Sequence, residues 1–486
     1  MVLNAQVGEK EHNAAPPRAP RWLLALLMAC AVAGILRAAL LLTHQPLIAL
    51  ANSYDEVRYT ACFDLYPDRP ADVPVTRNSP EAPYAHYRFL RNDAPLCYWS
   101  SELLLQGLVV AWYHGAEALS HDAVHSVRWL GALKFASLFV VWLAFTRSWL
   151  RRGEFRAALA NALLLPLLFA DPANTVYLNT FYAEWSALLA AYTLLGLVLL
   201  WLERDVNRAA QVLLALAAFA LATSKIQHLL LPLGCAAVLL GLDWLSVRRR
   251  WSWQGTAVLL GALAGLALQC VQLTRDSEAI RAIDMFNRAD VTFTGLLPNS
   301  TDPARTAATL GLDPECLQFS GLRAWEMPNY PGAVCPSLAH VTRGRELVVL
   351  LGEPDLSLRL GWRGVLALEP WLAPGLGLVE GGNFAGLPGD FSTFSHVLSA
   401  APPLRVLLLL APLLAVLPLL SIRPRYPRLL ALTGLAAMVM LASLTVTLLG
   451  DGMADTPKQG HLVLNAALAW WICILALGAG ARGGLR

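Results

Sequence analysis

Two adjacent carboxylates, Asp55 and Glu56, follow the first long apolar segment of the chain, and Arg58 comes directly behind them. This position predicts that the acids lie at the membrane surface, where the first helix emerges. A carboxylate there can bind a divalent cation or act as a general base towards a hydroxyl group. Acidic residues outside a membrane helix are usually only solvated, so position alone leaves both interpretations open.

Further ionisable side chains stand at the ends of later apolar segments. They are Arg128, Glu184, Lys225, His228, Lys458 and His461, with Tyr182 close to Glu184. Lysine, arginine and histidine can neutralise a phosphate, and arginine can do so with two parallel hydrogen bonds. A lipid phosphate that enters from the bilayer would need such cations together with the carboxylates. The alternative is that these side chains are interfacial anchors that reach to the lipid headgroups.

The composition identifies the elements that must position these residues. Of the 486 residues, 56% are hydrophobic and only 15% are charged, whereas soluble proteins carry about 25% charged residues. So much apolar sequence along the whole chain predicts an all-α polytopic membrane protein. The net charge of +3 is too small to indicate nucleic-acid binding.

Apolar length predicts about ten transmembrane helices, of which the third and fifth are short for a span of about 20 residues. The segments are Trp22–Thr43, Val127–Phe145, Ala157–Ala170, Trp185–Leu202, Ala209–Ala222, Leu229–Leu245, Gly255–Thr274, Leu404–Leu420, Leu429–Leu449 and His461–Leu477. With the N-terminus inside, every short arginine cluster falls on the inner face, as the positive-inside rule requires. Residues 44–126, 275–403 and 450–460 then form outer loops.

These spans divide the chain into four parts. They are a disordered cytoplasmic tail (1–20), a membrane module (21–274) with an outer catalytic loop (44–126), a large outer loop (275–403) and C-terminal transmembrane helices (404–486). Within the first loop, Ser101–Tyr113 predicts a helix that lies in the membrane interface. A true span at that position would invert the later topology, and the arginine distribution argues against it. The large loop predicts a small folded cap that includes an interfacial helix at Trp362–Trp371.

Four cysteines lie in the predicted outer loops, in two pairs. If both loops face an oxidising compartment, Cys62 can pair with Cys97 and Cys316 with Cys335. No Cys/His spacing indicates a metal site of that type.

Five motifs occur in one order along the chain. They are Asp55-Glu-Val-Arg-Tyr59, Pro95-Leu-Cys-Tyr-Trp99, Ser126-Val-Arg-Trp-Leu130, Tyr182-Ala-Glu-Trp-Ser-Ala-Leu188, and Thr223-Ser-Lys225 before Leu229-Leu-Leu-Pro-Leu233. Their order and spacing over Trp22–Leu240 resemble the GT-C glycosyltransferases that use a polyprenyl-phosphate sugar, of the aminoarabinose-transferase and protein-mannosyltransferase type. The sequence departs from that family in two places. A one-residue shift puts Ser224 before Lys225, and no glycine follows the lysine. The large outer loop has no family signature.

The resemblance implies a GT-C-like fold and transfer of a sugar to a hydroxyl of a glycolipid, polysaccharide or protein. Asp55 would be the general base, with Glu56 as the second candidate, and Glu184 would support a divalent cation such as Mg²⁺ or Mn²⁺ or orient the acceptor. The metal candidates are Asp55 and Glu184. The residues expected to bind substrate are Arg58, Arg128, Tyr182, Lys225, His228, Lys458 and His461.

The resemblance also implies a setting, a bacterial inner membrane with both chain ends in the cytoplasm and the large loops in the periplasm. Because the donor already carries a lipid phosphate, no nucleotide-binding loop is needed, and the sequence has no Walker-type motif. Three other functions stay open: a transporter or flippase for a lipid-linked saccharide, a glycan polymerase or ligase, and a non-enzymatic scaffold. A transporter would be expected to show inverted repeats and polar groups near the midplane, and the sequence shows no repeat.

Overall fold

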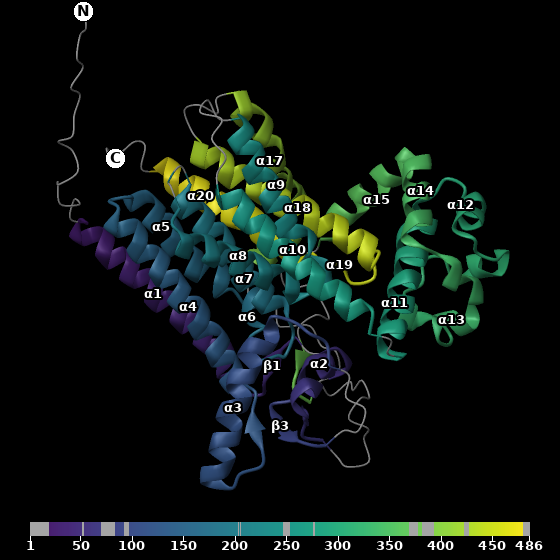
Figure 1. The fold of residues 1–486 in the computed structure, drawn as a ribbon, viewed down its shortest axis with the longest axis horizontal. Helices are drawn as coiled ribbons and strands as arrows, with labels where there is room; N and C mark the ends of the chain where they lie inside the picture. Colours follow the sequence, from purple (N-terminus) through teal and green to yellow (C-terminus); the bar gives the residue numbers. More distant parts are fainter. Residues whose placement is uncertain are drawn as a thin grey trace, which may run out of the picture.

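The computed structural model is almost entirely helical, with a bundle of long helices and two lobes at one end of it (Figure 1). It describes residues 19–50, 53–69, 83–91, 97–202, 204, 206–245, 253–275, 278–368, 378–381, 393–421 and 427–479.

Eight helices in this part of the chain are long and apolar enough to cross a membrane. They are α1 (Arg21–Leu42), α4 (Arg128–Arg151), α7 (Glu184–Trp201), α9 (Leu230–Leu245), α10 (Trp253–Leu273), α17 (Pro402–Ser421), α18 (Pro427–Gly450) and α20 (His461–Ala479). Two shorter apolar helices complete the bundle, α5 (Phe155–Leu164), which continues into the π-helix η2 (Leu165–Phe169), and α8 (Arg208–Ser224). All ten predicted spans are therefore helices, and α9 reaches the length of a span together with the 3-10 turn before it, over Ile226–Trp244.

The bundle packs most closely where small residues meet. Helix α8 lies against both α7 and α10, and a Cβ atom added at Gly261 of α10 would come within 2.1 Å of the carbonyl oxygen of Ala215 on α8. Small residues let helix backbones approach in this way inside a membrane, where association depends on van der Waals packing.

One end of the bundle carries the predicted inner arginines. Glu154, in the turn between α4 and α5, forms ion pairs with Arg204 (3.5 Å) and with Arg428. These three residues come from three different predicted inner loops, so their contact brings those loops to one face.

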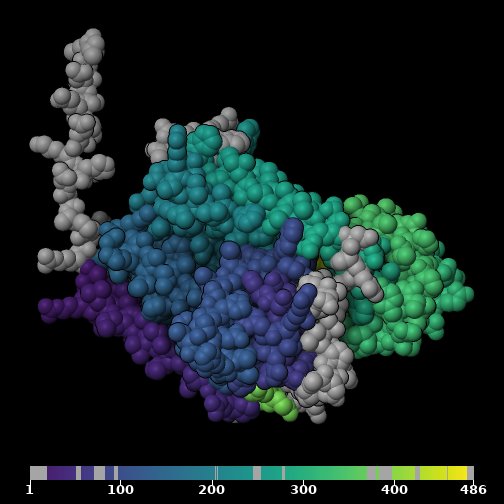
Figure 2. All heavy atoms as spheres, turned by 60° about the horizontal axis from the view of Figure 1, so that its bottom comes forward, coloured from purple at the N-terminus to yellow at the C-terminus, as the bar shows by residue number. Residues whose placement is uncertain are grey.

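The opposite end carries the predicted outer loops, and we call it the loop face. Backbone hydrogen bonds join Leu50 to Val176, Ser101 to Thr223 and Glu380 to Leu47, and the amide of Met453 donates to Thr294 Oγ1. Each bond joins two different segments. The three predicted outer loops and the two turns at residues 171–184 and 223–228 therefore form one continuous surface. In Figure 2 this surface comes forward, with the first loop in purple and blue near its middle and the cap in green at one end.

The first loop is a small lobe that the first predicted disulfide, Cys62–Cys97, closes. Its elements are β1 (Ile48–Ala49), α2 (Ser53–Thr60), η1 (Ala61–Phe63), β2 (Leu65–Pro67), β3 (His86–Phe89), α3 (Glu102–Ser120) and β4 (His125–Ser126). Strands β2, β3 and β4 form an antiparallel sheet in that order, with Tyr66 opposite Arg88 and Tyr87 opposite His125.

Helix α3 has the amphipathic character expected of an interfacial helix. Leu104, Leu108 and Trp112, spaced four residues apart, are exposed, whereas Glu102 and Gln106 are buried against the bundle. Side chains four residues apart share one helix face, so α3 presents an apolar stripe away from the protein.

The cap is a second lobe with its own apolar core, and the second predicted disulfide, Cys316–Cys335, lies within it. Its elements are α11 (Glu278–Asp290), η4 (Val291–Leu296), η5 (Leu297–Asn299), α12 (Pro303–Leu310), η6 (Pro314–Phe319), η7 (Ala324–Glu326), α13 (Pro331–Val334), η8 (Pro336–His340), α14 (Arg343–Gly352) and α15 (Pro354–Ala367). The predicted interfacial helix at Trp362–Trp371 corresponds to α15, which begins eight residues earlier; residues 369–377 lie outside the described residues.

Short elements complete the loop face. They are α6 (Pro172–Thr175), η3 (Ile226–His228), β5 (Leu378–Val379), α16 (Thr393–Ala400) and α19 (Thr456–Gln459). Strand β5 pairs antiparallel with β1, with Ile48 opposite Val379, and so ties the segment after the cap to the first loop.

Candidate functional site

A buried ion pair between two helix ends forms the centre of the loop face. The ammonium of Lys225, which directly follows α8, lies 2.5 Å from Glu184 Oε1 at the first position of α7. The carboxylate of Glu184 is 1% exposed and the side chain of Lys225 is 14% exposed. Apolar sequence ends at both residues, so the two helices deliver opposite charges to the same depth.

Lys458 adds a second cation beside this pair. Its ammonium lies 5.4 Å from the centre of the Tyr182 ring, in cation–π contact, and it forms an ion pair with Asp455. From the same short helix, Gln459 accepts a weak hydrogen bond of 3.5 Å from Lys225. The turn between α18 and α20 therefore closes over the ends of α7 and α8.

Two buried histidines complete the cluster, with their ring centres 6.4 Å apart. His461 Nδ1 lies 3.2 Å from the carbonyl oxygen of Lys458, and His228 Nδ1 lies 2.9 Å from Ser224 Oγ, whose proton is donated to Leu221 O. The carbonyl oxygen of Lys458 can only accept, so in the neutral ring Nδ1 of His461 carries the proton and Nε2 carries a lone pair.

Two buried polar atoms of the cluster have no hydrogen-bond partner among the described residues. They are Glu184 Oε2 and His461 Nε2. Buried polar atoms usually have a hydrogen-bond partner, which can be a water molecule, an ion or a ligand. A carboxylate oxygen and an imidazole nitrogen can both accept a hydroxyl proton, so the cluster is suited to a ligand that carries hydroxyl groups as well as negative charge.

A buried ion pair packs against the turn that carries Tyr182 and Glu184. Its two residues were not among those selected from the sequence. Lys134 Nζ lies 2.8 Å from Glu102 Oε1, both side chains are fully buried, and the same ammonium donates to the carbonyl of Thr180 at 2.6 Å. It also reaches the carbonyls of Tyr177 and Tyr182. A lysine inside an apolar span was the signal, because such a residue needs a partner.

Glu56 holds the first loop against this turn. Its oxygens accept hydrogen bonds from the Tyr87 hydroxyl (2.9 Å) and from the amide of Phe181 (3.2 Å). Burial, and then the nearby Glu56 charge, raise the pKa of Tyr87 well above its usual value, so Tyr87 stays a donor. Glu56 therefore has a positioning role in this structure. Asp55 lies in α2, and its side chain is outside the described residues.

The segment after Cys97 brings the first loop to the Lys225 turn. The carbonyl of Arg58 accepts a hydrogen bond from the Tyr98 amide at 2.7 Å, and Ser100 Oγ donates to the carbonyl of Ser224 at 2.6 Å. Arg58 is thus linked to the Lys225 turn through residues 98–100.

Arg128, expected to bind the donor phosphate, has another position. Its guanidinium donates to the carbonyls of Leu42 (2.6 Å) and His44 (2.7 Å) at the end of α1. These are orphan carbonyls of a helix C-terminus, which a cation satisfies well. The structure therefore gives Arg128 a helix-capping contact and does not join it to the cluster.

The structure does not test the predicted divalent-cation site, because the side chain of Asp55, one of its two predicted ligands, lies outside the described residues. None of them form a group of three or more His, Cys, Asp or Glu side chains that could hold a metal ion. Glu184 is adjacent to Lys225, and their ion pair occupies one of its two oxygens. A divalent cation at Glu184 would be repelled by that ammonium, so the donor set around Glu184 favours an anion.

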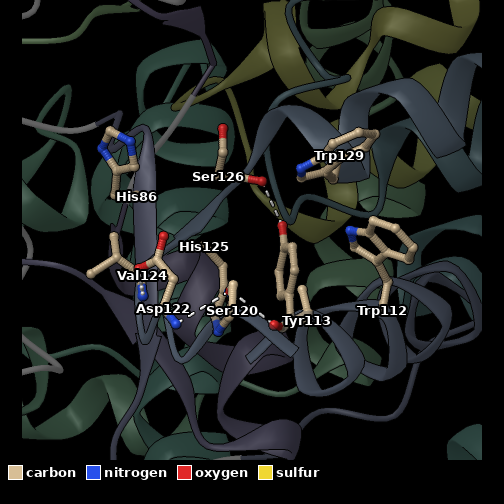
Figure 3. A pocket seen from close by; sticks show the side chains of 10 residues that line it. His86, Trp112, Tyr113, Ser120, Asp122, Val124, His125, Ser126 and Trp129 are labelled. Carbon is tan, nitrogen blue, oxygen red and sulfur yellow. Dashed lines mark hydrogen bonds between the residues drawn. The ribbon is translucent and has the colours of Figure 1, made fainter. Parts of the chain in front are cut away.

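A separate hollow of about 370 Å³ lies at the far end of α3, between that helix, β4 and the start of α4 (Figure 3). Trp112 and Trp129 form one side of it, and Tyr113 donates to the carbonyl of Ser126 at 2.7 Å. The described residues that line this hollow include no lysine or arginine, and so do not supply the cations that a phosphate would require.

The comparison with protein families agrees with this architecture. Residues 14–334 match the family model described as the YfdI N-terminal transmembrane domain. The chain belongs to this family. The YfdI-type domain begins just before α1 and ends inside the cap, so it includes Glu184, Lys225 and His228, whereas Lys458 and His461 come from helices beyond it. No curated protein and no solved structure matches the chain.

The chain is thus an integral membrane protein with a YfdI-type transmembrane domain. Of the residues selected from sequence, the structure brings together Tyr182, Glu184, Lys225, His228, Lys458 and His461. It uses Glu56 and Arg128 in contacts within the protein and links Arg58 to the Lys225 turn through residues 98–100.

Proposed function

We propose that this protein is a GT-C-like glycosyltransferase, which moves a sugar from a polyprenyl-phosphate donor to a hydroxyl of a glycolipid, polysaccharide or protein. The observation that carries the proposal is the convergence of two lysines and two histidines on the buried carboxylate Glu184 at the loop face. Such a site offers cations for a phosphate and acceptors for hydroxyl groups. The site lies at the ends of membrane helices, and this is the depth in the membrane at which the phosphate of a lipid lies.

The two lysines are the proposed phosphate-binding groups. Lys225 and Lys458 approach from different helices, and each is balanced by one acid, Glu184 and Asp455 respectively. A phosphate between them would exchange part of this internal pairing for contact with the donor. Ammonium groups act as point charges towards phosphate, so they can follow the charge that develops on the leaving group.

In the proposed reaction the acceptor hydroxyl attacks the anomeric carbon of the donor sugar. The bond from that carbon to the phosphate oxygen breaks, and its electron pair leaves with the polyprenyl phosphate, which Lys225 and Lys458 stabilise. The hydroxyl proton passes to a carboxylate. The family resemblance assigns this base to Asp55, which precedes Glu56, and Glu56 is hydrogen-bonded to the backbone three residues before Glu184. No step is routed through a metal ion.

The proposed setting is a bacterial inner membrane with the loop face in the periplasm. Both disulfides, Cys62–Cys97 and Cys316–Cys335, lie on this face, and disulfides persist in oxidising compartments. The inner arginines would then face the cytoplasm, in agreement with the positive-inside rule.

The test compares the masses of envelope glycans and glycolipids from cells that carry the wild type, Asp55→Asn, Glu184→Gln or a deletion. A matched control is Asp122→Asn, because Asp122 is an exposed acid of the same loop and its Oδ1 accepts a turn hydrogen bond that asparagine keeps. The proposal expects the deletion, Asp55→Asn and Glu184→Gln each to lack one sugar-sized increment, with Asp55→Asn present at the wild-type protein level, and Asp122→Asn to retain the increment.

A different pattern would reject the proposal. If Asp55→Asn and Glu184→Gln both keep the increment while the deletion removes it, these carboxylates do not serve transfer. If the deletion instead leaves an unmodified lipid-linked saccharide on the inner side only, the protein is a transporter. The buried Lys134–Glu102 pair does not by itself favour transport, because its hydrogen bonds to three backbone carbonyls explain it structurally.

A further inference from the structure

The cap carries a helical hairpin, α14 and α15, that has one buried face and one exposed face. Glu346 and Val349 of α14 are buried, as are Leu356, Leu360 and Gly364 of α15. The two helices pack against each other, and α15 also packs against α18. The hairpin is therefore firmly fixed to the protein on one side only.

The exposed face is strongly apolar. Its large side chains are each between 39% and 72% exposed, and they are Leu347, Val348, Leu351, Leu358, Trp362 and Leu366. On α15 the three residues are spaced by four, so they form one stripe along the helix. A soluble lobe rarely exposes so many neighbouring apolar groups unless a partner or a membrane covers them.

The arginines of the hairpin are directed away from this face, into contacts with the cap itself. Arg359 donates to the carbonyl of Asn299 at 2.8 Å and pairs with Glu353, and Arg363 donates to Asn299 Oδ1 at 3.0 Å. On α14, Arg345 donates to the carbonyl of Leu310 at 2.9 Å. These contacts hold the arginines of the hairpin on the cap, and Asp355 in the first turn of α15 is an exposed acid at the beginning of the apolar stripe.

The apolar face continues into the lipid-facing surface of the bundle. At the end of α15, the carbonyl of Leu366 accepts a hydrogen bond from Arg405 of α17 at 3.2 Å. Helix α17 is a candidate span with little burial, and Leu404 and Leu407 are exposed in its first turns. The hairpin thus meets the lipid-facing surface of the bundle at the start of α17. The start of α17 marks the edge of the bilayer on the loop face.

We infer that α14–α15 is a monotopic membrane element, whose Leu351, Leu358 and Trp362 lie in the bilayer leaflet on the loop face. Amphipathic helices with leucine and tryptophan on one face and basic residues on the other occupy this position, with the apolar side chains about 5–10 Å below the headgroups. Tryptophan is enriched at this depth. In Figure 1 α14 and α15 lie to the right of α18 and α19, well away from α3 at the bottom of the view.

This anchoring has a consequence for the cluster. The cap also holds the turn after α18, since Thr294 Oγ1 accepts from the amide of Met453 at 2.7 Å and Arg343 donates to the carbonyl of Leu449 at 2.6 Å. That turn leads directly to Asp455 and Lys458. A hairpin embedded in lipid therefore fixes the height of the cap, and with it the position of Lys458 above the membrane surface.

The test places single spin labels on the full chain in phosphatidylcholine–phosphatidylglycerol vesicles. Labelled Leu358→Cys and Trp362→Cys are compared with Ala308→Cys on α12, which is exposed on the cap, in a Cys270→Ser background that removes the exposed native thiol. Collision rates are measured with oxygen, which concentrates in lipid, and with a water-soluble nickel complex. Both hairpin labels should favour oxygen several-fold over nickel, whereas the label at position 308 should favour nickel.

Two outcomes overturn the inference. If the hairpin labels collide with nickel as readily as the label at position 308, the face is in water. If they are shielded from both reagents and show dipolar broadening that disappears when labelled protein is diluted with unlabelled protein, a second copy of the chain covers the face. Neither outcome depends on whether the protein transfers a sugar.

Discussion

Glu184 and Lys225 lie 41 residues apart in sequence, yet their charged atoms meet at 2.5 Å between the first residue of α7 and the residue after α8. Both are at the boundary between apolar helix and polar loop. Because a carboxylate and an ammonium are brought together there with one carboxylate oxygen left unsatisfied, this pair is the centre on which the proposed chemistry depends.

The first prediction separates the structural and functional roles of this pair. Glu184→Gln or Lys225→Met alone leaves one buried charge without its partner, so each should lower stability by several kcal/mol, in the range of about 3–5 kcal/mol typical of broken buried pairs. The double variant has no unpaired charge and should recover most of that stability. Thermal unfolding in detergent measures this.

Transfer should not recover with stability. Sugar transfer by the double variant should remain at least about 100-fold below wild type, the size of effect typical for a lost acid–base or phosphate-stabilising group. Recovery of transfer together with stability would show that the pair is needed only to hold α7 and α8 together.

Lys458 is expected to act on donor binding. Removing its charge in Lys458→Gln takes away a charge-assisted contact, commonly worth about 1.5–3 kcal/mol, so KM for the polyprenyl-phosphate sugar should rise about 10-fold to 100-fold. Lys458→Arg keeps the charge and should recover most of the affinity. An unchanged KM in Lys458→Gln, with the protein fully folded, would remove Lys458 from the donor site.

The buried pair of Lys134 and Glu102 should be required for the shape of the turn that carries Glu184. Lys134→Met removes hydrogen bonds to three carbonyls and leaves Glu102 unpaired in a site where burial already raises its pKa, so unfolding should occur at a lower temperature. Adding Glu102→Leu to Lys134→Met removes the unpaired acid and should restore part of the stability. A Lys134→Met protein as stable as wild type would contradict this role.

Asp290 gives a prediction for pH. This residue ends α11 and is buried against the α18–α19 turn, and burial together with the charge of Asp451 raises its pKa from 3.8 to about 8. The folded state therefore keeps a proton that the unfolded state has lost between about pH 4 and pH 8. By linkage, the free energy of unfolding falls as pH rises through this window and is constant above it.

The measurement compares wild type with Asp290→Asn, which keeps the oxygen that accepts the amide of Ala324 at 2.7 Å. The unfolding temperature of the variant should exceed that of the wild type by an increasing amount as the pH rises from 4 to 8. If the unfolding temperatures of the two proteins change in parallel with pH, the pKa of Asp290 in the folded protein is close to its usual value and the prediction is wrong.

The membrane architecture could be predicted from local sequence. Apolar length and the positions of arginines predicted ten helices, their order and the loops that share a face, and these features could be read because membrane insertion depends on local hydrophobicity and charge. The two cysteine pairs were predicted from loop membership. The sequence also selected six members of the cluster, because ionisable residues at the ends of apolar segments are few and conspicuous.

Only the tertiary structure decided which of these residues meet and what each contacts. Arg128 has the same local signature as Lys225, but it caps α1, and Glu56 accepts hydrogen bonds from Tyr87 and Phe181. Lys134 stands within an apolar span, and its partner Glu102 comes from another helix. Such roles depend on the rotation of each helix about its axis and on contacts between distant segments, which hydrophobic length and charge along the chain do not specify.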